Sequence, residues 1–165
     1  MNRLEERSVQ SNSAIEDATG AEGLPAHADL RRLLEYWNLQ RGERAFPRRA
    51  DIDPIDLAFM LDRIALTEVH AGVDDGPLRY RLRLVGTWWY RMAGFEATGT
   101  WLEDWPHANL HRITVEFYRA LLKGAWPRFT RRDAFVDGQV LRYEIMLLPL
   151  SEDGENISMI LTGIG

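Results

Sequence analysis

The segment at residues 78–85, LRYRLRLV, constrains the fold more strongly than any other part of the sequence. Its side chains alternate between apolar and cationic along the chain: Leu78, Tyr80, Leu82 and Leu84 against Arg79, Arg81 and Arg83. Because successive side chains of a strand point to opposite faces of a sheet, the pattern predicts a strand with one buried and one solvated face. The aromatic run WWYRMA follows and stops at Gly94, which predicts short helices over the buried face. A face covered in this loose way could hold a small molecule.

The composition limits the classes of protein that this chain can belong to. With 165 residues it can form one domain with a hydrophobic core. Its net charge of −5 argues against a general nucleic-acid-binding protein, which needs a basic surface. It has no cysteine, which excludes disulfides, thiolate nucleophiles and cysteine-based metal clusters. No stretch approaches the roughly 20 apolar residues that cross a bilayer, and no apolar signal segment opens the chain, so we expect a cytoplasmic protein without a membrane partner.

The chain divides into three parts. Residues 1–26 contain few large apolar side chains and are predicted to form a disordered tail. Residues 27–62 are predicted to form a helical extension, with its main helix at 29–41. Residues 63–165 have the pattern of an α+β domain, with strands expected at 64–70, 78–85, 126–136, 140–150 and 157–164 and a long helix at 110–123. Two strands, a helical connection and three strands predict a five-stranded, mostly antiparallel sheet with helices on one face.

This order of elements, and the residues within it, resemble a PAS domain. The resemblance is closer still to the short stand-alone PAS proteins of alphaproteobacteria, sometimes called the PAS_5 family. It is carried by five segments spread over about residues 30–165: LLEYWNLQRG, PRRADIDPIDL, RLVGT, AGFEATG and RYEIMLLPLSEDG. Each segment alone has little specificity, and their order and spacing together carry the resemblance.

The resemblance implies a PAS-like fold and a sensor or interaction module, with no shared reaction. In PAS domains a small ligand can lie between the longer central helix and the inner face of the sheet, and helices that precede the domain often mediate dimers. A stand-alone member has no output domain, so a signal would pass to a partner protein that the sequence does not identify. Some PAS sensors bind haem through a histidine of the central helix, and His111 lies near the start of that helix here.

The predicted ligand pocket consists of inward-facing side chains from the strands, the aromatic run and the central helix: Leu82, Leu84, Trp89, Phe117, Leu121, Tyr143 and Ile145. Alternation against Arg142 and Glu144 places Tyr143 on the same face as Ile145. The aromatic residues of this region could also be core residues that fill the space beneath short helices. A ligand pocket and a packed core are therefore both open interpretations.

The predicted N-terminal helix carries one apolar stripe that has to be buried: Leu30, Leu33, Leu34 and Trp37. If the central helices cover the sheet, this helix packs elsewhere on the domain or against a second copy of the chain. We predict a homodimer through this stripe.

No set of residues in the sequence points to catalysis or to a metal site. His107 and His111 have an i, i+4 spacing that could ligate a metal, but no carboxylate or third histidine completes a set, and a capping or solvated histidine is the simpler interpretation. The serines lack the glycine-flanked turn of a nucleophile, and no phosphate-binding motif is present. The arginines of the strand at 78–85 form either a solvated face paired with acidic residues or a surface for an acidic partner. We expect no enzymatic activity, and the sequence identifies no cofactor.

The sequence therefore predicts a non-enzymatic signalling module that binds a small ligand or a protein partner. The alternative is a ligand-free dimerisation or adaptor domain with a fully packed aromatic core. The two interpretations differ in whether a cavity remains between residues 117–121 and the strand face around Leu82 and Tyr143.

Overall fold

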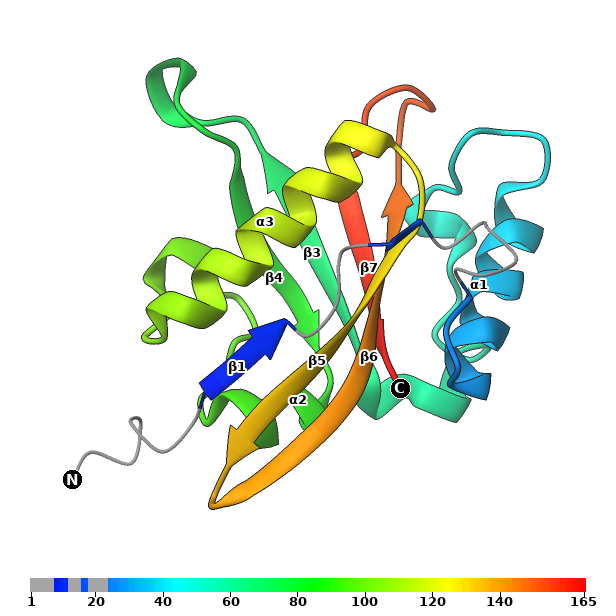
Figure 1. The fold of residues 1–165 in the computed structure, drawn as a ribbon. Helices are drawn as coiled ribbons and strands as arrows, with labels where there is room; N and C mark the ends of the chain where they lie inside the picture. Colours follow the sequence, from blue (N-terminus) through cyan, green and yellow to red (C-terminus); the bar gives the residue numbers. More distant parts are fainter. Residues whose placement is uncertain (1–7, 12–15, 18–23) are drawn as a thin grey trace.

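The computed structural model describes residues 8–11, 16–17 and 24–165 of the chain. Five long strands form one antiparallel sheet in the spatial order β4-β3-β7-β6-β5 (Figure 1). These strands are β3 (Ile64–His70), β4 (Arg79–Val85), β5 (Arg128–Val136), β6 (Gln139–Leu150) and β7 (Met159–Ile164). The last strand lies between the two hairpins, β3-β4 and β5-β6, and joins them. The predicted five-stranded α+β fold is confirmed.

Two short N-terminal strands extend the sheet at the edge formed by β5. These are β1 (Ser8–Ser11) and β2 (Glu16–Asp17), and both pair with β5 in antiparallel orientation. Backbone pairing at these positions differs from the disordered tail predicted for residues 1–26. The rest of that prediction falls on 1–7, 12–15 and 18–23, which lie outside the described residues, and on residues 24–26, which precede the N-cap His27.

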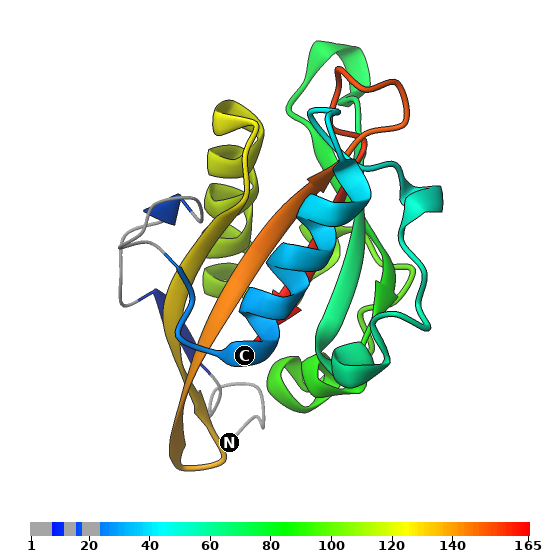
Figure 2. The same cartoon turned by 90° about the vertical axis from the view of Figure 1, so that its right-hand side faces the viewer.

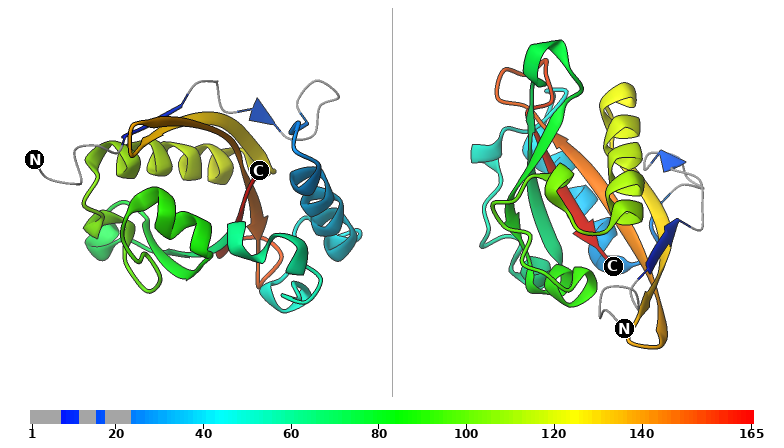
Figure 3. Two further views of the ribbon diagram at one scale, coloured as in Figure 1. Left: turned by 90° about the horizontal axis from the view of Figure 1, so that it is seen from below. Right: turned by 90° about the vertical axis from the view of Figure 1, so that its left-hand side faces the viewer.

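The inner face of the sheet is the one covered by the long helix α3 (Ala108–Gly124). The short helix α2 (Thr87–Ala93) and the 3₁₀ turn η4 (Leu102–Asp104) pack on the same side (Figure 3). Together they bury one hydrophobic cluster with the strands, which includes Tyr80, Phe117, Leu121, Ile145 and Ile160. None of the described helices is long and apolar enough to cross a membrane.

The outer face of the sheet is covered by α1 (Ala28–Arg41), the main helix of the predicted N-terminal extension (Figure 2). His27 caps the helix, because its Nδ1 accepts a hydrogen bond from the Asp29 amide at 3.2 Å. Gly42 ends it with φ of 57°, a conformation that glycine adopts without strain. Two 3₁₀ elements, η1 (Arg49–Asp51) and η2 (Ala58–Arg63), complete the connection to β3.

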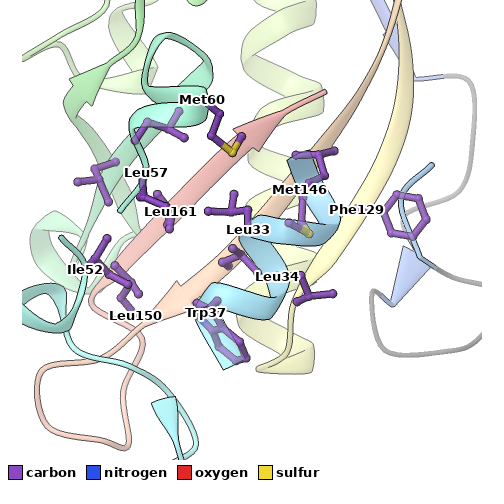
Figure 4. Close-up of a cluster of buried hydrophobic side chains, with 14 of the residues drawn as sticks. Leu33, Leu34, Trp37, Ile52, Leu57, Met60, Phe129, Met146, Leu150 and Leu161 are labelled. Carbon is purple, nitrogen blue, oxygen red and sulfur yellow. The ribbon is translucent and has the colours of Figure 1, made fainter. Parts of the chain in front are cut away.

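The apolar stripe of α1 is buried against the sheet of its own chain (Figure 4). Leu30, Leu33 and Trp37 have no exposed surface, and Leu34 has 7%. The indole Nε1 of Trp37 donates to the carbonyl of Pro149 on β6 at 2.8 Å. The four side chains are therefore not available to a second copy of the chain, and the prediction that they form a dimer interface is wrong. Their burial was predicted correctly, but their packing partner is the outer face of the sheet.

Strand β4 contains an irregularity that changes which side chains face inward. Leu66 of β3 pairs with Leu84, whereas the next residue, Thr67, pairs with Leu82, so Arg83 is an extra residue in β4. Such a bulge reverses the alternation of side chains beyond it. Leu84 is consequently 37% exposed, and its neighbour Val85 faces the interior instead. The prediction that Leu84 lines the pocket is therefore wrong.

Replacement of Trp37 by alanine should lower the free energy of unfolding by about 3–5 kcal/mol, because a fully buried aromatic ring is lost. Urea denaturation measures the change. Leu39→Ala is the control, because Leu39 lies on the same helix with 76% of its surface exposed and should change stability by about 0.5 kcal/mol or less. Equal effects of the two substitutions would contradict the packing of α1 on the sheet.

The bulge in β4 predicts opposite behaviour for two leucines that simple alternation treats as equivalent. Leu82→Ala should cost about 2–5 kcal/mol of unfolding free energy, because Leu82 is 3% exposed. Leu84→Ala should cost about 1 kcal/mol or less, because this side chain is already partly in water. The same denaturation experiment measures both, and comparable losses would show that β4 has no bulge.

Candidate ligand-binding cavity

A small cavity of about 30 Å³ lies between α3 and the inner face of the sheet. Its wall comes from β3, β4, α2, the segment at residues 94–105, α3, β5, β6 and β7. The lining is mostly apolar, and four of the predicted pocket residues belong to it: Leu82, Trp89, Phe117 and Ile145. The predicted position of the pocket, between the central helix and the strands, is therefore where the cavity occurs.

The other predicted pocket residues lie around the cavity without lining it. Leu121 is fully buried in the same inner cluster, one turn beyond Phe117 on α3. Tyr143 is 7% exposed and packs edge-on against Trp88, with ring centroids 5.3 Å apart. Leu84 lies beyond the bulge in β4 and opposite a member of the outer cluster. The prediction that Leu84, Leu121 and Tyr143 line the cavity is therefore wrong.

Sequence reasoning missed a charged residue in the cavity wall, Arg132 of β5. This side chain is only 3% exposed. The signal was present, because alternation along RFTRRDAFV places Arg132 on the same face as Ala134, which is fully buried. Residue type alone argues against this position, because arginine is seldom found fully buried without a partner.

The guanidinium of Arg132 makes few contacts for a buried cation. Its Nη2 donates to the carbonyl of Ile113 at a long 3.4 Å, and its carbon lies 5.2 Å from the centroid of the Phe117 ring. Its Nε is buried without a hydrogen-bond partner. Within the described part of the chain, no ion pair joins Arg132 to a carboxylate, whereas the neighbouring Arg131 pairs with Glu144 at 3.1 Å. The guanidinium also interacts with the Tyr143 hydroxyl. Arg132 is therefore a buried positive charge with an unsatisfied Nε and without a carboxylate partner in the described part of the chain.

Two nearby tyrosines do not supply the missing negative charge. Burial raises the pKa of Tyr118 and the pKa of Tyr143 above the ordinary value for a phenol, so both are neutral near pH 7. The Tyr118 hydroxyl is already hydrogen-bonded to the Thr67 hydroxyl at 2.9 Å. Burial also lowers the pKa of the Arg132 guanidinium, the direction expected for a cation held out of water. Arginine nevertheless remains protonated at neutral pH.

A second hydrogen-bond donor in the cavity wall is also unsatisfied. The indole Nε1 of Trp89 is buried without a partner among the described residues. Its ring is held in place by Trp88, at 5.8 Å between ring centroids and nearly perpendicular to it. A buried donor without a partner destabilises the fold. A hydrogen-bond acceptor inside the cavity would remove this penalty. The space suffices for a water molecule in the conformation described.

Arg132 also borders the outside of the molecule. A surface hollow of about 760 Å³ lies where β5 and β6 approach the start of α1, and Arg132 and Tyr143 belong to its wall. Arg132 therefore contributes to the wall of the inner cavity and to the wall of this surface hollow.

The histidines lie outside the cavity. His111 borders a different surface hollow, together with Arg79 and Glu103, and does not line the inner cavity. The ring Nε2 of His107 lies 3.0 Å from the carbonyl of Ala93, at the start of α3. In the described ranges, no three histidine, aspartate or glutamate residues group as metal ligands. The position of His111 gives no support to haem held inside the domain.

The arginines of β4 have partners on the solvated side of the strand. Arg79 pairs with Glu103 at 2.5 Å, and Arg83 lies 3.9 Å from Glu68 of the neighbouring strand β3. The guanidinium of Arg79 also lies over the ring of Trp101, 4.0 Å from its centroid. These contacts favour the interpretation of a solvated, ion-paired face.

Replacement of Arg132 by methionine should raise the free energy of unfolding of the ligand-free protein by about 1 kcal/mol or more, because an unpaired buried charge is replaced by an apolar side chain. Thermal and urea denaturation measure it. Arg142→Met is the control, because the Arg142 side chain is 84% exposed and should change stability by about 0.5 kcal/mol or less. If the free energy of unfolding of the Arg132 variant instead falls by about 2 kcal/mol or more, the guanidinium stabilises the fold.

Comparison with known proteins places this architecture in a family. A search of curated proteins found no match. The family model PAS_5, described as a PAS domain, matches residues 26–164, which includes α1 as well as the sheet and its inner helices. The suspected family is thereby confirmed, and the match covers both layers of the fold. The chain belongs to the PAS_5 family of PAS domains, a class of sensor and interaction modules in signal transduction.

Proposed function

We propose that this protein is a non-enzymatic sensor that binds a small ligand in the cavity between α3 and the inner face of the sheet. The observation that carries the proposal is the set of buried polar atoms in the cavity wall that lack a hydrogen-bond partner: Arg132 Nε, Trp89 Nε1 and Thr162 Oγ1. Unsatisfied buried donors in an otherwise apolar pocket are typical of a site that an acceptor-bearing molecule completes. The cavity wall, as described, contains no histidine, carboxylate or serine that would serve as a catalytic base or nucleophile.

The size of the cavity requires it to expand around a ligand. Its volume is about 30 Å³, whereas small-molecule sites commonly have some 300–1,000 Å³. The short elements α2 and η4 and the loop between them form one side of the cavity, and Trp89, Ala97 and Trp105 come from this region. Short helices held by few hydrogen bonds move more readily than the strands opposite, so this side is where opening would occur.

The same small volume favours a second function, a ligand-free adaptor or dimerisation domain. In that case the aromatic side chains are core residues, and buried water forms hydrogen bonds with the unsatisfied polar atoms of the wall. The two functions make different predictions about what the purified protein contains.

Strand β7 connects the cavity to α1, because neighbouring residues of this strand face each of them. Thr162 of β7 lines the cavity, and the next residue, Gly163, faces α1. A Cβ at position 163 would lie only 2.5 Å from a methyl group of Leu33, so helix and strand are in direct contact there. A ligand that displaces β7 therefore also displaces α1, because tightly packed layers transmit small shifts. We place the output of the sensor at α1 and at a protein partner that binds it.

Native mass spectrometry of the purified protein tests the proposal. A reproducible additional mass that denaturation releases is expected for the sensor, and the same spectrum gives the oligomeric state. The variant Ala97→Leu, which adds volume to the cavity wall, should lose the additional mass. Leu39→Ala, on the exposed surface of α1, should keep it. A measured mass equal to that of the polypeptide alone, before and after incubation with cell extract, would favour the adaptor function.

A further inference from the structure

We infer that the ligand of the inner cavity is a small organic monocarboxylic acid, whose carboxylate pairs with Arg132 and whose apolar body packs against Trp89 and Phe117. The inference rests on the proposed function, ligand binding in this cavity, and adds the chemical class of the ligand. It follows from the charge, the donors and the apolar surface of the cavity wall.

The charge of the cavity selects an anion. Arg132 is the one charged residue of the lining as described, and it has no carboxylate partner there. The arginines beside it are paired, Arg131 with Glu144 and Arg142 with Asp133 at 3.4 Å. A buried cation is stable only when an opposite charge or several acceptors compensate for the lost water. A ligand with one negative charge supplies that compensation.

The donors favour a carboxylate among the possible anions. The guanidinium of Arg132 is planar and presents parallel N–H groups that match the two oxygens of a carboxylate. Its Nε is free to donate, and Trp89 Nε1 offers a further donor in the same cavity. A phosphate or a dicarboxylate would bring a second negative charge, for which the described lining has no second cation.

The rest of the wall determines the body of the acid. Apart from Arg132 and a few hydroxyl groups, the cavity is lined by aliphatic and aromatic side chains, among them Leu82, Phe117 and Leu147. A hydrocarbon chain or an aromatic ring buries apolar surface against such a wall. The ammonium group of an amino acid would be buried there without a carboxylate partner, because the described lining has none. The small starting volume favours acids with few heavy atoms.

Matched pairs of acids and their neutral amides provide the test. Isothermal titration calorimetry and the shift of the melting temperature would be measured with butyrate and butyramide, benzoate and benzamide, and phenylacetate and phenylacetamide. In each pair the body is the same and only the charge differs. We expect at least one acid to bind about tenfold or more tightly than its amide, the ratio expected for a charge-assisted bond.

Two arginine variants assign the preference to a residue. Arg132→Met should abolish the difference between acid and amide, whereas Arg142→Met, at the surface of the neighbouring hollow, should retain it. If Arg132→Met does not fold, Arg132→Lys, which keeps the charge but not the bidentate geometry, takes its place and should weaken acid binding.

The outcomes separate this inference from the proposed function. Acids and amides that bind equally, or amides that bind alone, overturn the carboxylate assignment and leave the sensor function standing. An acid preference that persists in Arg132→Met overturns the role of Arg132. If no acid binds while native mass spectrometry still detects a bound mass, the ligand belongs to another class. If no acid binds and native mass spectrometry detects no bound mass, the sensor function itself is overturned.

Discussion

The two layers of this molecule depend on strand β7, which is buried on both of its faces. Ile160, Thr162 and Ile164 face the inner helices, while Leu161 faces α1, and all four have at most 2% of their surface exposed. Gly163 lets α1 approach where a larger residue would collide with Leu33. Because β7 pairs with both β3 and β6, it holds together two hairpins that are otherwise not hydrogen-bonded to each other. Loss of β7 would therefore remove the sheet and both helix layers at once.

Burial on both faces also places the inner cavity and helix α1 on opposite sides of the same strand. The cavity and α1 are separated by the thickness of one strand, and neighbouring residues of the same strand face each of them. On β6 the alternation is the same, with Leu147 in the cavity wall and Met146 and Leu148 in the outer cluster. The cost of the arrangement is seen at Arg132, where a charge is buried without a partner. A buried charge without a carboxylate partner lowers the stability of the fold, and this observation underlies the proposed ligand site.

Periodicity predicted most of the elements. The strand at Ile64–His70 matches its predicted bounds, and α1, α3 and the remaining strands differ by one or two residues at their ends. Alternation also located Leu82 and Ile145 in the cavity wall, and the central helix supplied Phe117. It failed at Leu84, because a bulge in the pairing with β3 reverses the faces and depends on the neighbouring strand. On β5 the same alternation places Arg132 on the inner face with Ala134.

The sequence by itself determined which side chains had to be buried: the stripe of α1, the inner faces of the strands and one face of the central helix. Amphipathic periodicity is a local property, so it can be read from neighbouring residues. Only the tertiary structure decided what each apolar face packs against. The stripe of α1 meets the outer face of its own sheet instead of a second chain, and the aromatic residues close the cavity to about 30 Å³. These outcomes depend on contacts between residues more than 100 positions apart, such as Trp37 with Pro149, which no local pattern encodes.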